Sequence, residues 1–124
     1  MKKEVIYLDD SEIMLEMVKH TLESQGYSVY TVSSWPELNP YLFRKKIRIL
    51  LCDVDMPGLG GDKLVSVLKE SVPDLKIFLF SSLEEEKLEE LCTQYKLDGW
   101  ISKQWEKEKW LKKLETFFEK GYTL

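Results

Sequence analysis

The chain has 124 residues, a formal net charge of −4 and a hydrophobic content of 44%. This length predicts one domain, residues 1–124, since domains most often contain about 100–150 residues, and the composition is typical of a chain with a buried core. The sequence has no dense basic cluster, no signal peptide and no apolar run near about 20 residues, which argues against nucleic acid and membrane partners.

The first predicted strand is a short apolar run, residues 4–8, that ends in the acid pair Asp9-Asp10. Ser11 is suited to cap the N-terminus of the helix that follows, and Gly26 ends that helix. Five residues recur at helical spacing and predict the face of this helix that packs on a sheet; they are Met14, Met17, Val18, Thr21 and Leu22.

The next segment predicts a strand and an irregular helix. Residues 27–32 are rich in β-forming side chains and predict a second strand. Pro36 is acceptable in a first helical turn, whereas Pro40, four residues later, is not easily placed inside a helix. We therefore predict a short or distorted helix over residues 37–45.

The segment from 47 to 53 is apolar and ends in Asp53, which a loop rich in proline and glycine follows at 54–60. A short apolar run bounded by turn signals predicts a buried strand of a parallel sheet. In open α/β sheets, ligands bind beyond the carboxyl ends of the strands. We therefore expect Asp53 at the edge of the sheet where such proteins carry out chemistry.

The rest of the chain repeats this pattern. A helix ends before Pro73, and it is followed by a strand at 76–81, a helix at 84–96, a strand at 99–102 and a helix at 105–119. A strand and a helix thus alternate five times. This predicts an α/β fold with a five-stranded doubly wound parallel sheet, flavodoxin-like, in the strand order 2-1-3-4-5.

The two cysteines, Cys52 and Cys92, fall in a predicted strand and a predicted helix. The chain has one histidine and no CxxC pair, so it lacks a zinc-ligand pattern and a disulfide framework. We expect both thiols to be reduced and buried, in a cytoplasmic protein.

If the strands are parallel neighbours, the polar residues at their ends converge; they are Asp9, Asp10, Asp53, Ser81 and Lys103. Carboxylates that lie close together repel one another, and a bound hard cation such as Mg²⁺ relieves the repulsion. A carboxylate beside that cation can attack phosphorus and form an acyl phosphate. The lysine and the hydroxyl can hold the new phosphoryl oxygens.

This combination resembles the receiver domain of bacterial two-component response regulators, of the single-domain chemotaxis type. The resemblance covers nearly the whole chain, and it rests on Asp9, Asp10, Asp53, Met56, Pro57, Gly61, Ser81 and Lys103. It implies that Asp53 is the phosphoacceptor. It also implies a Mg²⁺ site in which Asp10 binds directly, Asp9 binds partly through water, and Asp53 and the backbone carbonyl of Asp55 complete the protein ligands.

The resemblance further implies that Ser81 and Lys103 bind the phosphoryl group and that Trp100 is the switch aromatic. The ordinary alternatives are a helix cap for Ser81 and a solvated side chain for Lys103. Gln104 stands where the family has a proline in a cis bond, and a cis bond to another residue costs about 2.5–4 kcal/mol. The loop is therefore expected to be either trans and reshaped, or strained. The Trp100 indole needs a hydrogen-bond partner if it is buried.

The implied partners are proteins. A sensor histidine kinase or a phosphotransfer protein donates the phosphoryl group, and a downstream target reads the face formed by residues 84–96, 99–102 and 105–119. The chain is expected to be a monomer or a weak homodimer, and to catalyse only its own phosphorylation and dephosphorylation.

Three alternatives remain open from the residues. Asp53-Val54-Asp55 resembles the first motif of haloacid-dehalogenase-type phosphatases, although that motif does not require acids upstream. A receiver-like interaction module that is never phosphorylated is the second. A flavodoxin relative is the third, but no phosphate loop rich in serine, threonine and glycine follows the first strand.

Overall fold

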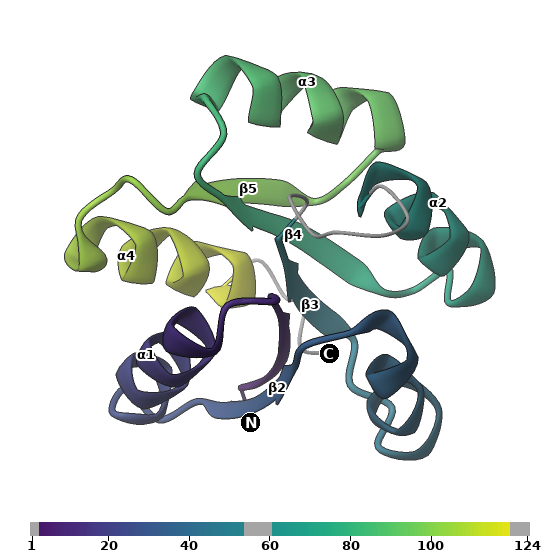
Figure 1. The fold of residues 1–124 in the computed structure, drawn as a ribbon, viewed down its shortest axis with the longest axis horizontal. Helices are drawn as coiled ribbons and strands as arrows, with labels where there is room; N and C mark the ends of the chain where they lie inside the picture. Colours follow the sequence, from purple (N-terminus) through teal and green to yellow (C-terminus); the bar gives the residue numbers. More distant parts are fainter. Residues whose placement is uncertain (1–2, 54–60, 120–124) are drawn as a thin grey trace.

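Five parallel strands form one sheet in the order β2-β1-β3-β4-β5, which confirms the predicted topology (Figure 1). The structure, a computed structural model, describes residues 3–53 and 61–119. The strands are β1 (Glu4–Leu8), β2 (Ser28–Val32), β3 (Ile49–Cys52), β4 (Lys76–Ser81) and β5 (Gly99–Ser102). Every residue of β3 is buried, as expected for a strand that is covered on both faces.

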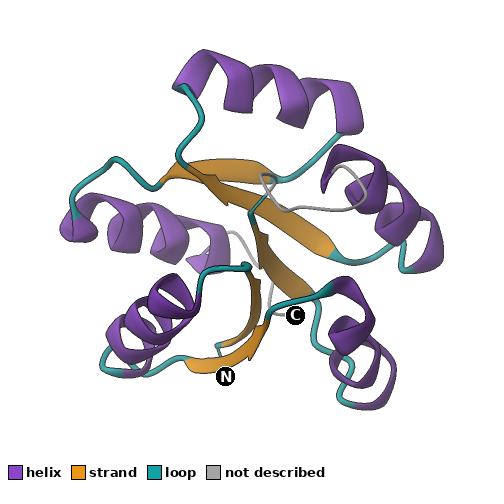
Figure 2. Cartoon of the chain, viewed as in Figure 1, coloured by secondary structure: helices purple, strands orange, loops and turns teal. Residues whose placement is uncertain are grey.

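Helical segments cover both faces of the sheet, as Figure 2 shows. They are α1 (Glu12–Glu23), α2 (Gly61–Ser71), α3 (Glu85–Tyr95), α4 (Lys107–Phe117), a 3₁₀-helix (Trp35–Leu38) and a π-helix (Pro40–Arg44). Side chains of α1 and α4 pack in one core cluster with the same face of β1 and β4. The opposite face packs against α2, α3 and the segment from 35 to 44.

The predicted distortion after β2 is confirmed. Pro40 has no N–H to donate, and the segment continues with a π-type bond in which the Lys45 N–H donates to the Pro40 carbonyl at 3.1 Å. Leu38 and Leu42 are both buried, so this irregular segment still covers the sheet.

Several details differ from the sequence predictions. Met17 is 45% exposed, whereas its neighbour Val18 is fully buried, so the prediction that Met17 packs on the sheet is wrong. Successive helical residues are about 100° apart, and Met17 lies just past the edge of the buried stripe. The last helix begins at Lys107, two residues later than predicted, and β3 begins at Ile49 rather than at 47.

Both cysteines are free and buried, as predicted. Burial, and to a smaller extent the neighbouring Glu89 and Asp98, raise the pKa of the Cys92 thiol to about 12. Burial is also the main cause that raises the pKa of Cys52. Within the described part of the chain, no helix is long and apolar enough to cross a membrane.

The strand register positions the site. Leu8 at the end of β1 pairs with Cys52 at the end of β3, and the Asp53 N–H donates to the Leu8 carbonyl at 3.0 Å. At the other side of the sheet, Ser81 in β4 pairs with Ser102 in β5. The residues that follow these four strands therefore meet at one edge.

Candidate functional site

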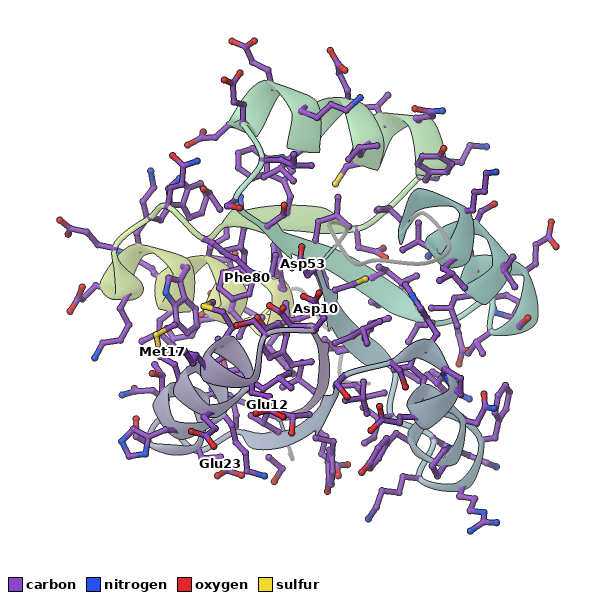
Figure 3. The ribbon with its side chains drawn as sticks, in the orientation of Figure 1. Asp10, Glu12, Met17, Glu23, Asp53 and Phe80 are labelled. Carbon is purple, nitrogen blue, oxygen red and sulfur yellow. The ribbon has the colours of Figure 1, made fainter. Side chains whose placement is uncertain are left out.

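Three carboxylates meet at the carboxyl edge of the sheet. Asp9, Asp10 and Asp53 each offer an oxygen atom, and these oxygens lie within 4.8 Å of one another. Figure 3 shows Asp10 and Asp53 close together where β1 and β3 end. The structure thus brings together the acids that the sequence predicted to converge.

The three acids differ in their surroundings. Asp9 is fully buried and Asp53 is 6% exposed, whereas Asp10 is exposed. The chain leaves β1 at Leu8 and bends at Asp10, just before α1 begins, so the two neighbouring acids lie in different surroundings. Asp9 therefore belongs to the buried part of the site, and the neighbouring Asp10 faces solvent.

Lys103 joins the two buried acids. Its Nζ donates to Asp9 Oδ2 at 2.6 Å and to Asp53 Oδ2 at 2.9 Å. Its side chain is only 14% exposed, so the alternative of a solvated lysine is wrong. Burial alone would lower the pKa of Lys103, but the hydrogen bonds and the charges of Asp9 and Asp53 outweigh it and raise that pKa.

The loop after Lys103 takes the reshaped trans form. The described residues contain no cis peptide bond. The Gln104 N–H donates to the Ser102 hydroxyl at 3.1 Å, and the Gln104 side-chain amide donates to the Ser82 carbonyl at 2.8 Å. The Lys103 N–H donates to the Ser81 carbonyl at 2.8 Å. These bonds hold Lys103 at the site although no proline follows it.

Tyr7 is a site residue that the sequence reasoning missed. It is fully buried, and its hydroxyl donates to Asp9 Oδ2. Burial is the main cause that raises the pKa of this phenol, and Asp9 adds to it. The available signal was the spacing, because residues two apart in a strand point to the same face.

Asp9 is therefore held from three directions. Besides Tyr7 and Lys103, the Ser11 N–H donates to Asp9 Oδ1 at 3.0 Å. Burial alone would raise the pKa of Asp9, but the bonds from Lys103, Tyr7 and Ser11 outweigh it and leave that pKa below its ordinary value. The carboxylate remains ionised in spite of its burial.

Ser81 is fully buried at the end of β4. Its hydroxyl accepts the Leu83 N–H at 3.1 Å, a turn contact two residues along the chain, and it does not cap α3, whose N-cap residue is Glu84. A contact of this hydroxyl with a phosphoryl group stays a prediction. Asp55, whose carbonyl was assigned to the metal, lies outside the described residues, as do Met56 and Pro57.

Trp100 on β5 finds its hydrogen-bond partner on α3. The Trp100 indole N–H donates to Glu89 at 2.6 Å, and the Trp105 indole N–H donates to Glu85, one helical turn away, at 2.8 Å. The centroids of the two indole rings are 5.4 Å apart. The pair of indoles thus joins the segment from 100 to 105 to the surface of α3.

The acidic cluster fits a hard divalent cation. Mg²⁺ binds oxygen atoms at about 2.0–2.1 Å, so two ligands on opposite sides of it are about 4 Å apart. The oxygens of Asp9, Asp10 and Asp53 come within 4.8 Å of one another, which is close to that span. The donor set also suits such an ion, since all three groups are carboxylates.

Comparison with known proteins agrees with this geometry. Residues 5–115 match the response regulator receiver domain family. Over 103 residues, the chain is 29% identical to the hydrogenase transcriptional regulatory protein HoxA of Cupriavidus necator. The matched region covers 78% of this chain and 21% of that protein. The chain therefore spans about a fifth of that relative's length.

Two solved structures share the fold. Chemotaxis protein CheY4 of Vibrio cholerae has a TM-score of 0.82 at 24% identity, over 94% of this chain and 98% of that one. The receiver domain of RcsB from Salmonella enterica serovar Typhimurium was solved with the phosphomimetic BeF₃⁻. It has a TM-score of 0.81 at 23% identity, over 98% of this chain and 91% of that one. Neither the phosphatase alternative nor the flavodoxin alternative is favoured by these matches. The chain belongs to the family of response regulator receiver domains, which act as phosphoacceptors in two-component signalling.

Proposed function

We propose that Asp53 accepts a phosphoryl group from the phosphohistidine of a sensor histidine kinase or a phosphotransfer protein. The observation that carries the proposal is the Lys103 ammonium, which lies 2.6 Å from Asp9 and 2.9 Å from Asp53 beside a third carboxylate. A structural ion pair does not need the exposed acid Asp10 next to it. By contrast, a site that binds a cation and a phosphoryl group needs such an additional carboxylate as a ligand for the cation.

The proposed reaction is a nucleophilic displacement at phosphorus. A carboxylate oxygen of Asp53 attacks the phosphorus atom, the P–N bond to the donor histidine breaks, and its electron pair stays on the imidazole nitrogen. Hydrolysis then removes the group: a water oxygen attacks phosphorus, the bond between phosphorus and the Asp53 oxygen breaks with its electron pair on that oxygen, and the protons of the water pass to the released phosphate and to solvent. The chain promotes only these two reactions of its own side chain.

Lys103 supplies the positive charge for the phosphoryl oxygens. Its ammonium already bonds to Asp53, so it needs little displacement to donate to an oxygen on the new phosphoryl group. Ser81, at the neighbouring strand end, is the proposed hydroxyl donor to a second oxygen. Ser81 is fully buried and the Lys103 side chain is only 14% exposed, and hydrogen bonds shielded from solvent in this way are stronger than in water.

Asp10, Asp9, Asp53 and the backbone carbonyl of Asp55 are the proposed ligands of Mg²⁺. When bound, the ion neutralises charge on the carboxylates and on the phosphoryl oxygens. The exposed Asp10 is the group most available for direct binding. The oxygens of Asp9 already accept three hydrogen bonds, which agrees with a role partly through water.

Trp100 is the proposed switch aromatic, and the face formed by α3, β5 and α4 is the proposed target surface. A hollow of about 470 Å³ lies on this face beside Trp100, between Glu89 of α3 and Lys113 of α4. Either a downstream target protein binds there to the monomer, or a second copy of this chain binds there in a weak homodimer. The proposal places the protein in the cytoplasm, where ATP is available to phosphorylate a kinase.

The test is intact mass after incubation with Mg²⁺ and acetyl phosphate, for the wild type and for Asp53→Asn. One added phosphoryl group is expected in the wild type and none in the variant or with EDTA. No phosphoryl group on the wild type would contradict the proposal and favour the interaction module. Continued release of phosphate over many turnovers of a phosphomonoester would instead favour a phosphatase.

The bond from Trp100 to Glu89 is expected to oppose the switch. Glu89→Ala removes the acceptor, and it is expected to raise the affinity for beryllofluoride in the presence of Mg²⁺ by about fivefold, equivalent to about 1 kcal/mol for one hydrogen bond. The measurement is a titration followed by ¹⁹F NMR of fluorotryptophan-labelled protein. Glu90→Ala is the control, because Glu90 lies on the same helix and pairs only loosely with Lys87, at 3.9 Å. Equal affinities in the two variants would show that the bond has no such effect.

A further inference from the structure

A buried phenol contacts the site from inside the core. The Tyr7 side chain is fully buried on the sheet face that α1 and α4 cover. Its ring centroid lies 5.7 Å from that of Phe80, at an interplanar angle of 54°. The ring therefore has no room to move freely, and its hydroxyl is held at a defined point beneath Asp9.

The phenol is the first member of a chain of contacts that ends at the proposed phosphoacceptor. Tyr7 donates to Asp9 Oδ2, Lys103 donates to the same oxygen at 2.6 Å, and Lys103 also donates to Asp53 at 2.9 Å. The Lys103 ammonium further lies 5.8 Å from the centroid of the Phe80 ring. Tyr7 and Lys103 thus share both an acceptor and a supporting ring.

We propose that Tyr7 is a positioning residue: its hydroxyl fixes the Asp9 carboxylate in the orientation that holds the Lys103 ammonium beside Asp53. This inference rests on the function proposed above for Asp53 and Lys103. Tyr7 does not touch the phosphoryl group, and it acts through Asp9 alone.

The hydrogen bonds that the Asp9 carboxylate accepts support this role of Tyr7. Each carboxylate oxygen has about two lone pairs to offer. Oδ2 uses both, for Tyr7 and Lys103, while Oδ1 accepts the Ser11 N–H at 3.0 Å. Of the two donors to Oδ2, the Tyr7 hydroxyl belongs to a fully buried ring, whereas the Lys103 ammonium ends a flexible side chain. Without the phenol, no fixed donor holds Oδ2, so this oxygen can shift together with the ammonium and draw Lys103 away from Asp53.

A purely structural role for Tyr7 predicts something different. In that case the hydroxyl only satisfies a buried acid, and its loss lowers stability without a selective effect on the site. The two roles can be distinguished by three measurements on the same variant: the affinity for a phosphoryl mimic, the stability of the protein, and the ¹⁵N resonance of the Lys103 ammonium.

Tyr27 offers a matched control. It belongs to the same core cluster and is 4% exposed, but its buried hydroxyl has no hydrogen-bond partner among residues 3–53 and 61–119. Tyr27→Phe therefore removes the same atom from the same core without touching Asp9.

The experiment compares the wild type, Tyr7→Phe and Tyr27→Phe. In Tyr7→Phe the Kd for beryllofluoride in saturating Mg²⁺ is expected to rise about tenfold, the scale on which outer partners of a site act. The ¹⁵N resonance of the Lys103 ammonium is expected to shift or broaden in metal-free buffer. Tyr27→Phe is expected to change neither.

A beryllofluoride Kd and a Lys103 resonance in Tyr7→Phe that match the wild type would overturn the inference, even if the melting temperature falls. Failure of the wild type to bind beryllofluoride would count against the proposed function instead. The Lys103 resonance, which needs no ligand, would then still decide whether Tyr7 positions the ammonium.

Discussion

Replacing Lys103 with methionine is expected to lower the free energy of unfolding by about 3 kcal/mol in metal-free buffer. Removal of one partner from a buried ion pair leaves uncompensated charge, and such changes are strongly destabilising. Here two carboxylates lose their partner, Asp9 with a side chain 1% exposed and Asp53 with one 8% exposed. Urea denaturation measures the loss. Mg²⁺ is expected to restore part of it, since a ligand that binds only the folded state stabilises that state.

This stabilisation should depend on pH in a defined way. The pKa of Asp9 lies below its ordinary value of 3.8, so its contribution is present above pH 3.8 and is lost as the pH falls further. The pKa of Lys103 lies above its ordinary value of 10.5, so its contribution is present below pH 10.5 and is lost as the pH rises further. The difference between wild type and Lys103→Met is therefore expected to be largest between these limits.

Lys87→Met is the matched control. Lys87 pairs with Glu90 at 3.9 Å, but the two side chains are 56% and 73% exposed. Exposed pairs contribute about 0–1 kcal/mol, so this variant should stay close to the wild type. If Lys103→Met were no less stable than Lys87→Met, the ammonium would not be holding the two acids together.

The second large effect is expected at Asp10. Asp10→Asn should weaken Mg²⁺ binding by more than about tenfold, because it removes the exposed carboxylate proposed as the direct ligand, and even outer partners of metal sites are worth at least that much. The stability of the metal-free protein should be unchanged or higher, since one of three neighbouring negative charges is removed. Calorimetric titration with Mg²⁺ measures the first effect and urea denaturation the second.

Two comparisons make this prediction specific. Glu12→Gln removes another exposed acid from the first turn of α1 and should leave Mg²⁺ binding almost unchanged (Figure 3). Asp9→Asn should destabilise the metal-free protein, because it alters a fully buried group that accepts three hydrogen bonds. Similar Mg²⁺ affinities for Asp10→Asn and Glu12→Gln would contradict the proposed ligand set.

The sheet could be predicted because its signals are local. Each buried strand is a short apolar run, and β1, β4 and β5 begin and end where the sequence indicated. The misassigned Met17 and the shifted start of α4 are errors at edges, where one residue decides between core and solvent. The two prolines at 36 and 40 were sufficient to predict an irregular helix but not its division into 3₁₀ and π turns.

The site was predictable to the extent that it follows from strand order. Residues that end neighbouring parallel strands must meet, and Asp9, Asp10, Asp53 and Lys103 do. The partners of Trp100 and Trp105 were not predictable, since the placement of Glu85 and Glu89 depends on how α3 docks. The contact of Tyr7 with Asp9 was overlooked because an aromatic residue in a buried strand is ordinarily core.

The most direct test of the central claim is the position of the phosphoryl group. Borohydride reduces an acyl phosphate on aspartate to homoserine, and peptide mass mapping then identifies the residue. After treatment with Mg²⁺ and acetyl phosphate, homoserine is expected at position 53, and none is expected when EDTA is present. Homoserine at another acid, or at no position, would contradict the account of Asp53 as the phosphoacceptor.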